Sequence, residues 1–182
     1  MGRTILLTGR PGVGKTTVIK RVVEQLGARA GGFYTAEMRK GGRRQGFKIV
    51  TLDGQEGILS HVDIKGRPRV SRYGVNLTDL DEVAVAALRQ AIAEANCIVV
   101  DEIGKMELFS EEFRKAVTEA VESEKPVLGT VMATRHPWVD ALKALPQVTV
   151  LELTHHNRDK MVQRVVDILE DPGHAWAVTS LA

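Results

Sequence analysis

The chain has 182 residues, of which 43% are hydrophobic and 26% are charged, and its formal net charge is +2 at pH 7. This length and composition suit one globular domain and exclude a disordered or fibrous protein. No apolar stretch approaches the ~20 residues needed to cross a bilayer, and a secretory signal pattern is lacking. A single cysteine, Cys97, excludes an internal disulfide. We therefore expect a cytoplasmic protein without membrane association, and a monomer as the default.

The first predicted element is a buried strand over residues 4–8, and a glycine-rich loop follows it. Residues 9–17 read Gly-Arg-Pro-Gly-Val-Gly-Lys-Thr-Thr, which matches G-x-x-x-x-G-K-[ST]. In such loops backbone N–H groups and a helix N-terminus bind phosphate, the lysine reaches the β and γ phosphates, and the first hydroxyl ligates Mg²⁺. Lys15 and Thr16 take these places. The predicted nucleotide-binding residues are Gly9, Arg10, Pro11, Gly12, Val13, Gly14, Lys15, Thr16 and Thr17.

An antiparallel β-rich insertion is predicted over residues 33–77. Residues 33–38 and 47–52 form a hairpin around a Gly- and Arg-rich loop, and residues 57–62 and 70–77 add further strands. Between residues 39 and 72 there are nine Lys or Arg and three Asp or Glu. This basic region either receives a polyanion such as nucleic acid or is the solvated tip of the hairpin. An aromatic content of 4% disfavours single-strand stacking platforms.

An acidic strand is the second informative segment. Thr78 is predicted to cap a helix that ends near residue 95, and the apolar strand 97–102 then ends in Asp101 and Glu102. Ligands in open α/β sheets bind beyond the carboxyl ends of the strands, where the phosphate loop also lies. Asp101 is therefore predicted to hold Mg²⁺, as in a Walker B strand, and Glu102 to orient and deprotonate a water.

The remaining pattern alternates helices and strands. We expect a helix opening at residues 110–112, a strand over 126–132, a short helix over 137–145, a strand over 148–153 and a helix over 155–169. The fold class is α/β, a P-loop NTPase with a RecA-like, mainly parallel, doubly wound sheet and the inserted meander. Residues 1–170 form the predicted domain, and residues 171–182 an irregular tail. Thr130 is a candidate polar sensor of the γ phosphate or the attacking water.

Five segments carry a family resemblance. They are residues 9–17; 32–35 with 42–47; 73–77; 101–109 (Asp-Glu-Ile-Gly-Lys-Met-Glu-Leu-Phe), the most specific; and Leu153-Thr154 with Asn157-Arg158. From residue 4 to about residue 169 the chain resembles the small RecA-like nucleoside-triphosphatase family of thermophilic prokaryotes, known in animals as the cancer-related nucleoside-triphosphatase. The resemblance implies Mg²⁺-dependent hydrolysis of ATP, GTP, CTP and UTP to the diphosphate and phosphate.

The roles of two cations and the choice among the proposed reaction and two rivals stay open. Lys105 either stabilises transition-state charge beside the γ phosphate or pairs with Glu107 at the surface. Arg158 either contacts the nucleotide or caps a helix turn. The rival reactions are phosphoryl transfer to a nucleotide or polynucleotide acceptor and ATP hydrolysis linked to nucleic acid. Transfer is disfavoured because no arginine-rich lid segment follows the acidic strand, and nucleic acid is possible but not favoured.

Overall fold

One mixed sheet organises the protein. The computed structural model describes residues 2–170, and across them nine strands pair in the order β5-β6-β4-β3-β2-β7-β8-β1-β9. The strands are β1 (Thr4–Thr8), β2 (Ala30–Lys40), β3 (Arg43–Thr51), β4 (Glu56–His61), β5 (Arg69–Val70), β6 (Tyr73–Val75), β7 (Cys97–Ile103), β8 (Val127–Val131) and β9 (Val148–Glu152).

The parallel half of the sheet contains β2, β7, β8, β1 and β9. β8 lies between the phosphate-loop strand β1 and the acidic strand β7, so the predicted RecA-like arrangement is confirmed. Leu7 of β1 pairs with Thr130, and Val100 of β7 pairs with the neighbouring Gly129. Because the strands are parallel and in this register, the phosphate loop, Thr130 and Asp101 meet at one edge of the sheet.

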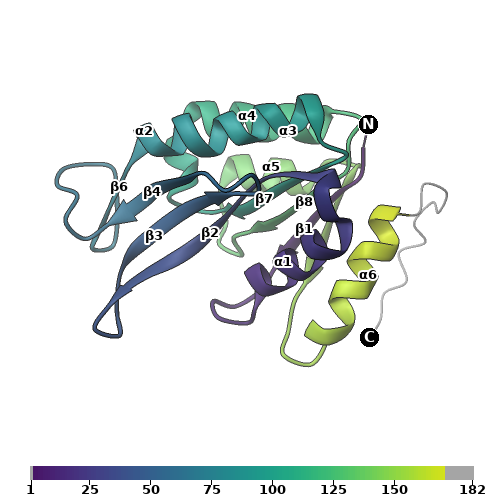
Figure 1. Cartoon of the computed structure of the whole chain (residues 1–182), viewed down its shortest axis with the longest axis horizontal. Helices are drawn as coiled ribbons and strands as arrows, with labels where there is room; N and C mark the ends of the chain where they lie inside the picture. Colours follow the sequence, from purple (N-terminus) through teal and green to yellow (C-terminus); the bar gives the residue numbers. More distant parts are fainter. Residues whose placement is uncertain (1, 171–182) are drawn as a thin grey trace.

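The inserted strands extend this sheet and do not form a separate one. β2 is shared: residues 30–33 pair in parallel with β7, and residues 33–40 pair antiparallel with β3. The β2–β3 hairpin projects beyond the rest of the sheet (Figure 1). The predicted single strand over residues 70–77 is wrong. It divides into β5 and β6, because the chain reverses at Ser71, which has a φ of 55°, and the two short strands pair with each other.

Helices cover both faces of the sheet (Figure 1). α1 (Lys15–Leu26) and α6 (Arg158–Glu170) pack side by side on one face, whereas α3 (Ala86–Glu94), α4 (Glu111–Glu122) and α5 (Pro137–Lys143) cover the other. β1 serves both cores, since Ile5 and Leu7 pack with α1 while Leu6 packs with α3 and α4. This alternation explains why β1 reads as a continuous apolar run.

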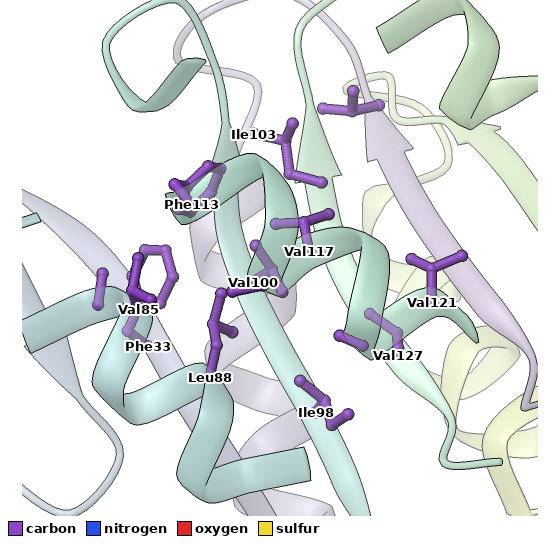
Figure 2. Close-up of a cluster of buried hydrophobic side chains, with 14 of the residues drawn as sticks. Phe33, Val85, Leu88, Ile98, Val100, Ile103, Phe113, Val117, Val121 and Val127 are labelled. Atoms are coloured by element: carbon purple, nitrogen blue, oxygen red, sulfur yellow. The ribbon is translucent and has the colours of Figure 1, made fainter. Parts of the chain in front are cut away.

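The core beneath α3 and α4 fixes the acidic strand. Ile98, Val100 and Ile103 of β7 point toward Leu88 of α3 and Val117 of α4 (Figure 2). All five are fully buried, and the ring of Phe33 meets that of Phe113 edge to face, with centroids 6.2 Å apart. Such interdigitated packing leaves little freedom for β7, so its polar tip is presented on a rigid support.

Two predicted helix starts are wrong. The helix that was predicted to start after Thr78 is capped by Asn76, whose side chain accepts a hydrogen bond from the Asp79 N–H at 3.1 Å. This helix runs from α2 (Leu77–Asp79) through a π-helical stretch, Leu80–Val85, into α3. The last helix begins at Arg158 and not at residue 155. In contrast, Ser110 caps α4 as predicted and accepts from the Phe113 N–H at 2.9 Å.

Within residues 2–170, no helix is long and apolar enough to cross a membrane. The predicted irregular tail, residues 171–182, lies outside the described residues.

Candidate active site

The phosphate loop, residues 9–14, connects β1 to α1. Gly12 has a φ of 79° and Gly14 a φ of 102°, a left-handed conformation that a residue with a β-carbon adopts only under strain. Gly14 is also the N-cap of α1, and no side chain caps this helix start. The first N–H groups of α1 are therefore available to an anion, and the helix dipole favours negative charge at the same place.

The Lys15 side chain extends across the phosphate loop to its first residues. Its Nζ donates to the carbonyl oxygens of Gly9 at 3.0 Å and Arg10 at 3.3 Å. Among the other predicted loop residues, Arg10, Pro11 and Thr17 are exposed, whereas the Val13 side chain is 2% exposed and packs into the core beneath the loop. Val13 can therefore serve a ligand only through its backbone, while its side chain anchors the loop.

Asp101 is a buried carboxylate at the end of β7, 1% exposed. Its Oδ1 accepts a hydrogen bond from the Thr130 hydroxyl at 2.5 Å, and its Oδ2 has no hydrogen-bond partner among residues 2–170. Burial raises the pKa of Asp101, whereas the hydroxyls of Thr130 and Thr16 and the Lys15 ammonium lower it. The Thr35 N–H also lowers the pKa of Asp101. A buried, half-satisfied carboxylate is costly, and a hard cation beside it would offset that cost.

Glu102 is half-buried and opens on a cavity of about 330 Å³ that also contains Lys15. Burial raises the pKa of Glu102 most, the charge of Asp101 raises it further, and Lys15 lowers it. Raised pKa values in a cleft are typical of proton-transfer groups. The far wall of the cavity comes from the inserted strands β2 to β5, through Thr35, Phe47, Leu59 and Val70.

Lys105 lines the same cavity and is exposed. The alternative in which it pairs with Glu107 at the surface is wrong, because Glu107 is only 4% exposed and the described residues contain no ion pair between the two. In the part of the chain that the structure describes, Lys105 forms no ion pair, and it lies beside the cavity on the loop after β7. Its position agrees with the predicted charge-stabilising role, which stays a prediction.

Arg158, the first residue of α6, lies over the phosphate loop. A β-carbon on Gly14 would lie 3.0 Å from its Cδ and 3.7 Å from one of its terminal guanidinium nitrogens. The turn before α6 is held by Asn157, whose side chain accepts from the Thr154 N–H at 2.8 Å, and the Leu153 N–H donates to the Thr8 carbonyl at 2.8 Å. These bonds fix α6 relative to β1 and so place Arg158 beside the predicted polyphosphate.

The structure thus brings the predicted residues of three distant segments to one sheet edge: the loop at residues 9–17, the strand end at 101–105 and Arg158. Sequence reasoning missed the cavity wall contributed by the insertion, because nothing local to Phe47 or Leu59 indicates that β3 and β4 join the main sheet. It also missed the burial of Glu107. The only available signal was the spacing of Glu107 within the specific segment 101–109.

Comparison with known proteins agrees with this geometry. A family model described as NTPase matches residues 4–166. The chain belongs to this NTPase family. Nucleoside-triphosphatase THEP1 of Thermotoga petrophila is 50% identical over 166 residues, which cover 91% of this chain and 92% of that protein.

Two solved structures resemble this NTPase-family chain along nearly their whole length. The crystal structure of THEP1 from the hyperthermophile Aquifex aeolicus is 39% identical, with a TM-score of 0.85, and the match covers 92% of this chain and 99% of that one. The solution structure of a human cancer-related nucleoside triphosphatase is 38% identical, with a TM-score of 0.81, and the match covers 95% and 100%. The predicted family and fold class are confirmed.

Proposed function

We propose that this NTPase-family chain hydrolyses nucleoside 5′-triphosphates to the diphosphate and phosphate in the presence of Mg²⁺, with Glu102 activating the water. The observation that carries the proposal is the meeting of Glu102 and Lys15 in one cavity beside the buried Asp101. The Thermotoga and human relatives are both named as nucleoside triphosphatases, which supports the reaction.

Mg²⁺ suits the donor set of Thr16 and Asp101. The buried Asp101 Oδ2 lacks a hydrogen-bond partner within residues 2–170, and the Thr16 hydroxyl lies near the same carboxylate. Mg²⁺ prefers oxygen ligands, keeps several waters and is bound through one or two protein groups together with the phosphates of the substrate. When bound, the ion would neutralise charge on the β and γ phosphates.

The chemistry assigned to Glu102 is general-base catalysis. Its carboxylate accepts a proton from a water whose oxygen attacks the γ-phosphorus. The bond from the γ-phosphorus to the β–γ bridging oxygen breaks, and the leaving diphosphate keeps the electron pair. Lys15 and Lys105 place positive charge around the transferred group, where charge shifts toward the leaving group. Burial of β7 by α3 and α4 holds Glu102 in position during this step.

A broad base range follows from what the loop contacts. The first N–H groups of α1, Lys15 and Arg158 lie where they can contact the polyphosphate, which ATP, GTP, CTP and UTP share. We therefore expect phosphate release from all four triphosphates at comparable rates when Mg²⁺ is present, and almost none when it is chelated. Release that stays unchanged without Mg²⁺, or no release from any triphosphate, would contradict the proposal.

Phosphoryl transfer is the second candidate, and one feature of the cavity is compatible with it. Beyond Glu102 the cavity extends along apolar side chains of the insertion, including Phe47 and Leu59, and such a wall could hold an acceptor. Incubation with ATP and candidate mono- and dinucleotides decides between the reactions. Free phosphate as the sole product supports hydrolysis, whereas a phosphorylated acceptor supports transfer.

Linkage to nucleic acid has weaker support. At the β2–β3 hairpin Arg39 and Arg44 both pair with Glu37, so two of the nine cations of the basic region form ion pairs within the hairpin. A shift assay with single-stranded RNA and DNA at two salt concentrations, together with phosphate release, tests this third reading.

Replacing Asp101 by asparagine is expected to raise the Mg²⁺ concentration needed for half-maximal phosphate release. A neutral amide is a poorer ligand for the hydrated ion than a carboxylate. The measurement is a Mg²⁺ titration of the rate at saturating ATP. Asp167→Asn, an exposed change on α6, is the control. An unchanged Mg²⁺ requirement in Asp101→Asn would place Asp101 outside the metal site.

Replacing Arg158 by alanine is expected to raise KM for ATP roughly tenfold with a smaller effect on kcat. A charge-assisted hydrogen bond contributes ~1.5 kcal/mol or more, which corresponds to about one order of magnitude in affinity. Arg164→Ala, which removes an exposed cation from the same helix, is the matched control. If both variants keep the KM of the wild type, Arg158 supports the turn before α6 and does not contact the nucleotide.

A further inference from the structure

Glu107 shares a small space with Glu102. It opens the 3₁₀ turn Glu107–Phe109 after β7, and its side chain turns back toward Gly104. A β-carbon on Gly104 would lie 3.0 Å from Glu107 Oε2 and 3.1 Å from Glu102 Oε1. The two carboxyl oxygens are therefore no farther apart than the sum of these distances, and both lie beside the space where Gly104 has no side chain.

The charges around Glu107 are mostly negative. Burial raises its pKa to about 8, the charge of Glu102 raises it next, and Asp101 contributes in the same direction, while the backbone N–H groups of Glu107 and Gly104 lower it. Lys15 of α1 and Lys105 line the same cavity, but neither forms an ion pair with Glu107 in the described part of the chain.

The neighbouring helix α4 does not supply a counter-charge either. Its first turn carries Glu111 and Glu112, which are exposed and pair with Lys115, and Glu112 also pairs with Arg89. The charges of Glu102 and Asp101 act on Glu107 and favour its protonated form.

We propose that Glu107 is a positioning residue: its buried carboxyl group faces Glu102 across Gly104 and holds the Glu102 carboxylate toward the cavity. The inference rests on the proposed role of Glu102 as the base. A neutral acid can donate its proton to a hydrogen bond with a carboxylate, whereas an ionised Glu107 repels it. Ionisation would also place a third negative charge beside Asp101 and Glu102, facing a polyanionic substrate.

A metal-binding role for Glu107 is not favoured. Among residues 2–170, no group of three or more His, Cys, Asp or Glu side chains is arranged to hold a metal ion. The Glu107 carboxyl group lies with that of Glu102 beside Gly104. Its effect on hydrolysis should therefore appear in kcat and in the pH profile, and not in the Mg²⁺ requirement.

The first test compares kcat against pH for the wild type, Glu107→Gln and the exposed control Glu122→Gln on α4. Glutamine keeps the shape of the neutral acid and cannot ionise. We expect the wild type and the control to lose kcat above about pH 8, approaching tenfold per pH unit, and Glu107→Gln to keep its kcat at pH 7 without this loss. The same alkaline loss in Glu107→Gln, or a folded variant inactive at pH 7, would overturn the inference.

The second test follows Tm against pH and does not depend on catalysis. Folded Glu107 holds its proton up to about pH 8, but in the unfolded chain it ionises near its ordinary value of 4.5. The unfolded wild type therefore binds fewer protons in this window, so wild-type stability falls as pH rises from about 4.5 to about 8. The Tm of Glu107→Gln relative to the wild type should rise across this window and level off above it.

These readouts separate the inference from the proposed function. A wild type that releases no phosphate refutes hydrolysis, and the Tm comparison still reports whether Glu107 is a buried neutral acid. If phosphate is released but the Tm difference does not change with pH, the inference about Glu107 fails by itself.

Gly104→Ala provides a variant that keeps both carboxyl groups. The added methyl group would lie 3.0 Å and 3.1 Å from the Glu107 and Glu102 oxygens, so one or both side chains must shift. We expect kcat to fall while equilibrium affinity for a labelled nucleotide is retained. An unchanged kcat would show that the relative placement of the two carboxyl groups is unimportant, contrary to the inference.

Discussion

Replacing Lys15 by alanine is expected to lower kcat/KM for ATP by at least about 10²-fold, the loss typical of removing one donor to a developing negative charge. Lys15 lies at the mouth of the phosphate loop, where its Nζ bonds to the Gly9 and Arg10 carbonyls, and it lines the cavity that contains Glu102. The ammonium can therefore reach both the bound phosphates and the group in transfer. Its loss should weaken nucleotide binding and the chemical step together.

The control for Lys15→Ala is Arg21→Ala, which removes an exposed cation from the same helix, away from the loop. Nucleotide affinity and steady-state phosphate release are measured on both variants, and circular dichroism checks that each is folded. Hydrolysis by Lys15→Ala at a rate close to that of the control would remove the phosphate loop from the catalytic site and refute the proposed function.

Sequence reasoning succeeded where the signal is local. The phosphate loop needs Gly12 and Gly14 for its left-handed backbone, and Lys15 follows Gly14 directly. One contiguous motif therefore specifies both the loop conformation and the phosphate-binding lysine. The part of β7 before Asp101, residues 97–100, is buried and apolar, as the centre of β1 is. Parallel strands then bring both ends to the same edge, which is why two separate motifs predicted one site.

The errors arose where distant contacts compete with local preference. Thr78 and Asn76 are both good caps by residue type, and Asn76 prevails because its side chain accepts the Asp79 N–H. The start of α6 moves to Arg158 because Asn157 bonds to the Thr154 backbone and to the Glu152 carbonyl, which holds residues 155–157 in a turn. Neither choice can be read from periodicity.

The cavity and Glu107 were beyond sequence reasoning for a different reason. A glutamate in a loop is normally solvated, so the sequence left a surface ion pair between Glu107 and Lys105 as an open alternative. The burial of Glu107 depends on the 3₁₀ turn after β7 and on the space left by Gly104, which appear only in the folded chain. The same holds for Phe47 and Leu59, which reach the site through the antiparallel extension of the sheet.

Replacing Glu102 by glutamine is expected to reduce kcat by on the order of 10²- to 10⁴-fold, the contribution of a positioned general base. Affinity for ATP should stay the same or increase, because Lys15, Thr16 and Asp101 would still hold the Mg²⁺ nucleotide. Burial and the charge of Asp101 both raise the pKa of Glu102, which shows that its negative charge is unfavourable even before a polyphosphate is bound. Glutamine removes that charge without changing the shape of the side chain.

Equilibrium binding of a labelled nucleotide and single-turnover phosphate release on the same folded protein separate binding from chemistry, with Glu122→Gln as the exposed control. Equal losses of affinity and rate in Glu102→Gln would indicate a metal or structural role. Loss of neither would make Glu102 a partly buried side chain without a catalytic task. A lower rate with retained affinity is expected only if Glu102 acts after the nucleotide is bound, because Lys15 and Asp101 then bind the substrate and Glu102 accepts the proton of the water.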